Sequence, residues 1–170
     1  MNLQPTLDND LLLIRPLRKD DFEALFSVAC DPLIWEQHPK QDRYKSSEFE
    51  LFFQESLESE GALVIIDKVT GLVIGSSRYK IVRGVNKAVE IGWSFLSRKY
   101  WGGKYNGAMK QLMIDHALKT VDDVILYVGR TNFRSQKAVE KIGGKRITEP
   151  KEVMKNAPDS LTFRISKGGL

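Results

Sequence analysis

The sequence predicts an α+β fold in which one sheet carries helices on both faces. Three strand patterns follow one another between residues 62 and 96 with only short turns between them, which indicates an antiparallel meander. Two helical patterns, over residues 104–120 and 131–142, then enclose a short, continuously apolar strand at 124–128. A chain of 170 residues is accounted for by one domain over residues 1–170.

The first third of the chain predicts one strand and two helices. Leu11–Leu17 is a short apolar run that suits a strand, and Asp20 and Asp21 then stand where a helix begins. A second helix is expected from Ser47, because Ser47 and Glu50 have the spacing of a capping box and phenylalanines recur there at helical spacing.

The remaining strands follow from alternation and turn residues. The meander comprises strands at 62–66, 72–82 and 88–96, and residues 146–148 and 161–166 are the last two candidates. The resulting order of elements, β-α-α-β-β-β-α-β-α-β-β, differs from a repeating βαβ fold.

Composition excludes several kinds of site. A single cysteine, Cys30, excludes a disulfide framework and a cysteine-based zinc site, and we expect it to be a buried apolar residue. Two histidines leave little for a histidine metal cluster. The first ten residues lack the features of a signal peptide, and no apolar run is long enough to span a membrane. We therefore expect a soluble, cytoplasmic protein without a bound metal.

Charge is unevenly distributed along the chain. The net charge is +4, but residues 1–60 hold 13 acidic and 6 basic residues, whereas residues 98–145 hold 10 basic and 4 acidic ones. A basic segment suits a polyanionic ligand and an acidic segment a cationic one, although both could be merely solvated faces. Nucleic acid is not expected, since no run of Lys and Arg interleaved with aromatic residues is present.

The most informative segment runs from Arg98 to Gly107. A strand ends, a loop containing Gly102 and Gly103 follows, and a helix begins, which leaves backbone N–H groups and the positive end of a helix dipole free to bind phosphate. Lys104 adds positive charge. Neither GxxxxGK[ST] nor GxGxxG is present, so a P-loop and a Rossmann site are excluded, while a plain tight turn stays open.

Several motifs along nearly the whole chain combine into a family resemblance. They are Leu13–Leu17 with Asp20–Phe22, Ile74–Gly75, Glu90–Trp93, Trp101–Tyr105, Asn132–Ser135 and Glu140–Gly143. In this order and spacing they resemble the GNAT superfamily of acetyl-CoA-dependent N-acetyltransferases. The ribosomal-protein N-terminal acetyltransferase-like branch is the most similar.

The resemblance implies a fold and a cosubstrate, acetyl-CoA. The fold is a mostly antiparallel sheet of six or seven strands with about four helices, whose middle strands, 88–96 and 124–128, splay apart to admit acetyl-CoA. The backbone of Phe95, Leu96 and Ser97 would pair with the pantetheine arm. The pyrophosphate would be held by the loop and helix start formed by Trp101, Gly102, Gly103, Lys104, Tyr105 and Asn106.

Two further residues are expected at the thiol end of the cosubstrate. By the same resemblance, Asn132 and Ser135 would face the thiol. Val139 stands where many members of the superfamily have a tyrosine as general acid, and Lys104 stands where the branch usually has Gly or Ala. Ser135, or water, is therefore expected to protonate the leaving thiolate, and the Lys104 side chain is expected to point away from the pyrophosphate.

Glu90 is the expected catalytic base. A free amine has a pKa of about 10 and must lose a proton before it attacks, and Glu90 is the only acid between Asp67 and Asp115. A side chain directed into the cleft would act directly or through water, whereas a surface position on the strand is the alternative. A backbone N–H of the same strand would hold the oxyanion. We expect direct transfer through a ternary complex.

The acceptor is expected to bind near residues 31–45. Trp35, Glu36 and His38 could line a wall that accepts an amine, although Trp35 could equally be core and His38 a local hydrogen-bonding residue of the loop. The acceptor would be the N-terminus of a protein or a small amine. Two copies of the chain could also pair through a sheet edge.

Two other functions stay open on the sequence alone. A non-catalytic acyl-CoA-binding or regulatory module with the same fold would bind the cosubstrate without turning over any amine. A basic nucleic-acid-binding domain would show steeply salt-dependent affinity, but the acidic first 60 residues argue against it.

Overall fold

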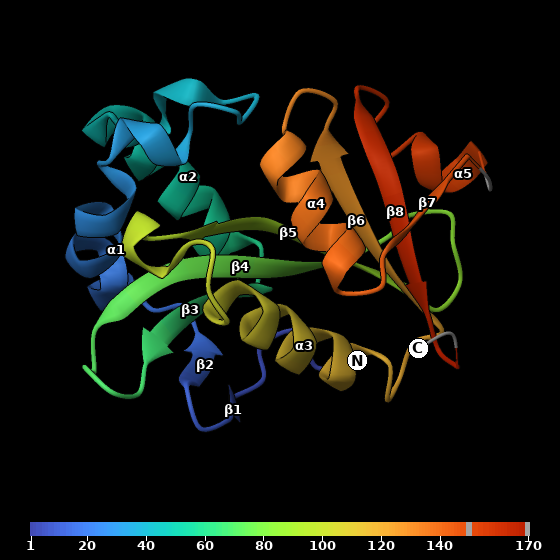
Figure 1. The fold of residues 1–170 in the computed structure, drawn as a ribbon, viewed down its shortest axis with the longest axis horizontal. Helices are drawn as coiled ribbons and strands as arrows, with labels where there is room; N and C mark the ends of the chain where they lie inside the picture. The colour runs from blue at the N-terminus through green and yellow to red at the C-terminus, as the bar shows by residue number, and fades with distance from the viewer. Residues whose placement is uncertain (149–150, 169–170) are drawn as a thin grey trace.

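A mixed sheet of eight strands forms the centre of the computed structural model, which describes residues 1–148 and 151–168 (Figure 1). The strands are β1 (Leu7–Asp8), β2 (Leu12–Pro16), β3 (Ala62–Asp67), β4 (Val73–Ile81), β5 (Ala88–Leu96), β6 (Asp123–Gly129), β7 (Lys145–Ile147) and β8 (Ser160–Ser166). Their order across the sheet is β1-β2-β3-β4-β5-β6-β8-β7, and all neighbours are antiparallel except β5 and β6. The predicted fold class is confirmed, and the short strands β1 and β7 complete the sheet.

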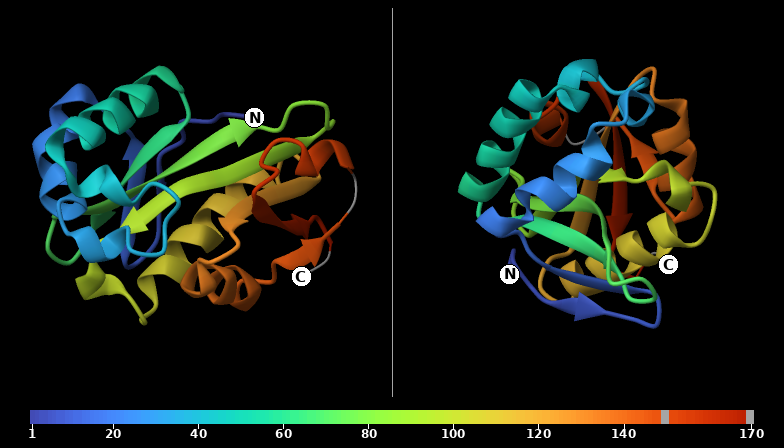
Figure 2. Two further views of the ribbon diagram at one scale, coloured as in Figure 1. Left: turned by 90° about the horizontal axis from the view of Figure 1, so that it is seen from above. Right: turned by 90° about the vertical axis from the view of Figure 1, so that its left-hand side faces the viewer.

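Helices cover both faces of this sheet. They are α1 (Phe22–Ala29), α2 (Ser46–Glu58), α3 (Tyr105–Ala117), α4 (Phe133–Lys141) and α5 (Lys151–Met154), with 3-10 turns η2 (Pro32–Ile34), η3 (Gln41–Tyr44) and η4 (Arg98–Tyr100). Side chains alternate along β3, so that Leu63 and Ile65 join the core under α3, whereas Ala62 and Val64 join the core under α1 and α2. Figure 2 shows α1 and α2 on one side of the sheet and α3 and α4 on the other.

The two middle strands diverge, as the resemblance implied. β5 and β6 pair only from Ala88 to Glu90, while β5 continues along β4 and β6 continues along β8. The cause lies in β5, whose register against β4 shifts between Ser76 and Arg78, opposite Trp93, which has a φ of 51°. An extra residue of this kind bends a strand and increases its twist, which turns the end of β5 away from β6.

Two local expectations are wrong. The capping box at Ser47 is wrong, because α2 begins one residue earlier, with Lys45 at the N-cap, and no side chain caps it. The 3-10 turn Lys19–Asp21 that leads into α1 has a bond of this kind instead, because Asp21 accepts the N–H of Arg18 at 2.8 Å. Cys30 is exposed rather than buried, since it follows the last turn of α1. Within the described ranges no helix is long and apolar enough to cross a membrane.

Candidate active site between β5 and β6

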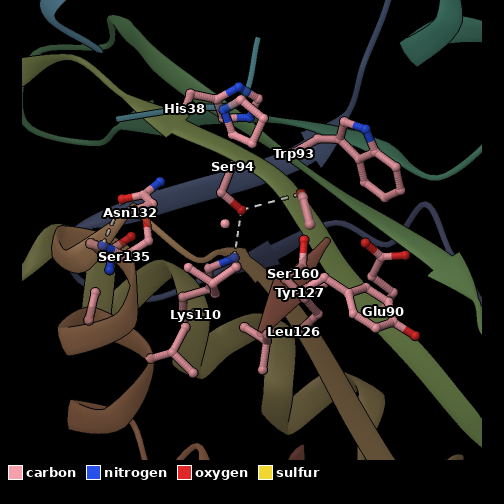
Figure 3. A pocket seen from close by; sticks show the side chains of 18 of the residues that line it. His38, Glu90, Trp93, Ser94, Lys110, Leu126, Tyr127, Asn132, Ser135 and Ser160 are labelled. Carbon is pink, nitrogen blue, oxygen red and sulfur yellow. Dashed lines mark hydrogen bonds between the residues drawn. The ribbon is translucent and has the colours of Figure 1, made fainter. Parts of the chain in front are cut away.

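Two adjoining cavities lie where β5 and β6 separate. The inner cavity, of about 270 Å³, reaches Glu90, Lys110 and Tyr127 (Figure 3). The outer cavity, of about 160 Å³, reaches Phe95, Leu96 and Trp101. Both are lined by His38, Ser94, Asn106, Asn132, Ser135 and Ala138. The two therefore form one passage into the sheet, walled by β5, β6, α3 and α4.

Glu90 stands at one end of the inner cavity, where the pairing of β5 with β6 stops. Burial raises the pKa of Glu90 to about 7, against the opposing effects of Lys80, Arg78 and Lys110. A carboxylate with a pKa near neutrality can both take and return a proton at physiological pH. In Figure 3 Ser135 lies at the opposite end of the pocket from Glu90, with Ser94 and Lys110 between them.

Gly92 leaves the space that the carboxylate of Glu90 occupies. A Cβ atom at Gly92 would lie 2.7 Å from Oε1 of Glu90. We therefore expect Gly92→Ala to displace this flexible side chain without unfolding the protein, and to lower the kcat of amine acetylation by about tenfold. Steady-state kinetics and a thermal melt check this. In a Glu90→Gln background the alanine should have no further effect on kcat, and an additional loss there would contradict the explanation.

Lys110 is a buried cation that the sequence analysis missed. It lies on α3 with 6% of its surface exposed, and its Nζ donates to Oγ of Ser94 at 2.5 Å. Burial lowers the pKa of Lys110 to about 7, although Glu90 acts to raise it. Lys110 precedes the buried residues Met113 and Ile114 by one helical turn and so lies on the same face of α3. The apolar periodicity of α3 could therefore have predicted that this lysine faces inward.

The C-terminal end of β5 offers backbone groups to the passage. The N–H of Ser97 bonds to the carbonyl of Ile74 on β4, and because the direction alternates along a strand, the backbone of Phe95 also faces β4. The backbone of Leu96 then faces the gap, where its carbonyl accepts the indole N–H of Trp101 at 2.9 Å. Of the three residues expected to pair with pantetheine, Leu96 is therefore the one with its backbone turned toward the passage.

The loop before α3 is open to solvent. Gly102 has a φ of +71°, and a Cβ on Gly103 would meet no atom within 4 Å. Lys104 is exposed at the N-cap, and no side chain caps the helix. The side chain of Tyr105 instead turns inward, since its hydroxyl donates to Asp67 at 3.3 Å. The first turn of α3 can therefore offer backbone N–H groups to an anion.

A shallow hollow adjoins this helix start. Its volume is about 690 Å³, and Lys104, Lys141 and Lys145 lie among its lining residues, none of which is acidic. The hollow combines side chains from α3, from α4 and from the chain after α4. Positive charge and an uncapped helix terminus at one place favour a polyanionic ligand.

The start of α4 brings two predicted residues to both cavities. Asn132 is the N-cap of α4, and its Oδ1 accepts the N–H of Ser135 at 3.1 Å. This bond fixes the direction of the Asn132 side chain. Arg134, which the sequence analysis missed, places its guanidinium 3.8 Å from the centre of the Trp101 ring and donates to the carbonyl of Ile34. It thereby joins α4 to the wall of the outer cavity.

The expected acceptor wall is only partly at the site. His38 lines both cavities, and burial, with Arg43 nearby, lowers its pKa to about 4, so the ring is neutral at pH 7. Trp35 lines the outer cavity and donates its indole N–H to Ala29. Glu36 is exposed and lies in neither lining, because this anchoring of Trp35 turns the next residue toward solvent. Arg43 lines the inner cavity instead.

Among residues 1–148 and 151–168, no group of three or more His, Cys, Asp or Glu side chains is placed to hold a metal ion.

Comparisons with known proteins agree with this geometry. A family model described as an acetyltransferase (GNAT) domain matches residues 12–145. An acetyltransferase from Agrobacterium tumefaciens has a TM-score of 0.76 at 24% identity, covering 96% of this chain and 95% of that one. A GNAT-family acetyltransferase from Bacillus anthracis has a TM-score of 0.74 at 18% identity, covering 95% and 98%. RimJ from Mycobacterium smegmatis, in complex with CoA-disulfide, has a TM-score of 0.68 at 14% identity, covering 98% and 88%. No curated protein matches the chain in sequence.

Proposed function

Because the chain belongs to the GNAT acetyltransferase family, we propose that it transfers the acetyl group of acetyl-CoA directly to a primary amine within a ternary complex. The observation that carries this proposal is the passage between β5 and β6, with a buried carboxylate at one end and a lysine-lined hollow outside the other. The motifs of the sequence favour the ribosomal-protein N-terminal acetyltransferase-like branch of the family.

The residues along the passage fit the chemistry of acetyl-CoA. The uncapped start of α3 and the hollow beside Lys104 suit the phosphates. The backbone of Leu96 suits an amide of the pantetheine arm, which would lie in the outer cavity against Trp101. Asn132 and Ser135 then line the place where the outer cavity opens into the inner one, which suits the thioester.

The proposed chemistry moves one acetyl group and two protons. The amine nitrogen forms a bond to the thioester carbonyl carbon, and its proton passes to Glu90, directly or through water. The bond between that carbon and the sulfur breaks, and the thiolate takes a proton from Ser135 or from water. Glu90 then releases its proton to solvent, and Ser135 or water regains one from solvent. A backbone N–H of β5 beyond Glu90, where β5 lacks β6 as its neighbour, would hold the oxyanion.

Thiol release from acetyl-CoA in the presence of amines tests this function. We expect release that depends on the amine, with the acetylated amine detected by mass. A protein that binds acetyl-CoA but acetylates no member of a broad amine panel would contradict the proposal and favour a non-catalytic acyl-CoA-binding module.

A further inference from the structure

The inner cavity brings together three ionisable side chains from three elements. Glu90 lies on β5, Lys110 on α3 and Arg43 on η3, and all three line the same space. Among the described residues, none of the three takes part in an ion pair with a nitrogen-to-oxygen separation of 4.0 Å or less. Charges withdrawn from water are costly unless a partner compensates them.

Lys110 has donors to spare. Its ammonium carries three N–H groups, and the described contacts use one of them, toward the hydroxyl of Ser94. Ser94 in turn shares a hydrogen bond of 2.7 Å with Ser77, so this partner is a neutral hydroxyl pair rather than a carboxylate. Lys110 therefore offers free donors to the inner cavity. Because burial lowers its pKa to about 7, the amine is only partly charged at pH 7, and a bound carboxylate would stabilise its charged form.

Arg43 adds a second cation to the same cavity. Its guanidinium lies 4.3 Å from the centre of the Phe52 ring and 5.6 Å from that of Trp35, and its Nη1 lies 3.3 Å from Nε2 of His38. These aromatic groups hold the guanidinium in place without neutralising it. The planar group keeps donors that suit a carboxylate.

Glu90 is the carboxylate that lines this cavity with them. Glu55 acts on Arg43. Glu90 acts on Lys110, but neither carboxylate forms an ion pair with these side chains within 4.0 Å in the described structure. An acceptor that carried only an amine would leave the free donors of Lys110 and Arg43 without a carboxylate. A molecule with both an amine and an acid group would satisfy all three. At about 270 Å³, the cavity lies just below the roughly 300–1,000 Å³ typical of drug-sized ligands, which suits a molecule the size of an amino acid.

We infer that the acceptor is a primary amine that bears its own acid group, an α-amino acid being the simplest form, with Lys110 and Arg43 binding the carboxylate and the proton of the amine passing to Glu90 through water. This inference rests on the proposed function and names the substrate class of the same site. It sets a free amino acid above the N-terminus of a peptide, whose α-carboxylate has become an amide.

The test compares matched acceptors that differ only in the acid group. Acetyl-CoA is incubated with each standard L-amino acid, with its carboxamide, and with a tetrapeptide whose first residue is that amino acid. The rate of thiol release gives kcat/KM for each acceptor. For the best amino acid we expect roughly a 10- to 100-fold higher kcat/KM than for its amide, mainly through KM, as charge-assisted hydrogen bonds would give.

Variants assign the preference to its residues. Lys110→Met and Arg43→Gln should each reduce the ratio of acid to amide. Lys80→Met is the control, because Lys80 is an exposed cation near Glu90 that lies outside the lining of the inner cavity, and it should keep the ratio.

The outcomes separate this inference from the function beneath it. If amides or peptides are acetylated with the same kcat/KM as free amino acids, the inference is overturned, although the proposed acetyl transfer is not. An unchanged ratio in both Lys110→Met and Arg43→Gln would overturn the assignment of the carboxylate site. Binding of acetyl-CoA without transfer to any acceptor would instead contradict the proposed function itself.

Discussion

Glu90→Gln is expected to lower kcat/KM for amine acetylation by about 10²- to 10⁴-fold at pH 7, the range that general base catalysis contributes. Glutamine keeps the size and the hydrogen-bonding capacity of the side chain but cannot accept the proton of the amine. Gly92 has no side chain and leaves room beside the carboxylate, so the amide of the variant should occupy the same space. The affinity for acetyl-CoA should therefore not change.

The pH dependence identifies the base more specifically than the loss of rate. Burial raises the pKa of Glu90 to about 7, and only the ionised carboxylate accepts a proton, so activity of the wild type should rise as the pH increases through about 7. In Glu90→Gln this rise should disappear, leaving the slower increase that follows deprotonation of the acceptor amine near a pKa of about 10.

Lys110 titrates in the same range and needs its own control. Its charge lowers the pKa of Glu90, so in Lys110→Met the rise should persist and move to higher pH. A rise that vanished in Lys110→Met but survived in Glu90→Gln would assign the titration to the lysine and contradict the role of Glu90.

Gly103→Glu is expected to weaken the binding of acetyl-CoA by about 100-fold or more, through repulsion between the new carboxylate and the phosphates. Since a Cβ at Gly103 meets no atom within 4 Å, the side chain itself fits. A carboxylate near the amino end of α3 also stabilises the helix, so the melting temperature should not fall. Calorimetric titration measures the affinity.

Gly103→Ala is the matched control for this substitution. It adds a Cβ at the same open position without adding charge, and acetyl-CoA should bind as it does to the wild type. An equal loss of affinity in both variants would show that bulk rather than charge matters there, and unchanged affinity in Gly103→Glu would contradict the assignment of the loop to the phosphates.

Sequence patterns predicted the framework well because alternation and turn residues report directly on local structure. The three strands of the meander and the helices α3 and α4 follow from such patterns. The separation of β5 from β6 did not, and it was expected only from the family resemblance. It depends on the bulge at Trp93, whose positive φ no residue preference indicates.

The site was harder to predict, because it depends on contacts between distant segments. Glu90 stands on a regular strand and Asn132 at the N-cap of α4, so local backbone structure fixes where their side chains point. Glu36 and Arg43 both lie between α1 and α2, Glu36 on a turn and Arg43 on η3, and of the two only Arg43 lines the cavity. No local pattern encodes that choice.

Calorimetric titration of the purified protein with acetyl-CoA, with CoA and ATP as comparison ligands, tests the central claim that the passage between β5 and β6 is a site for acetyl-CoA. We predict micromolar binding of acetyl-CoA and of CoA, and no comparable binding of ATP, because the pantetheine arm in the outer cavity adds to the contacts of the phosphates. Absence of acetyl-CoA binding, or equal binding of ATP, would contradict that claim.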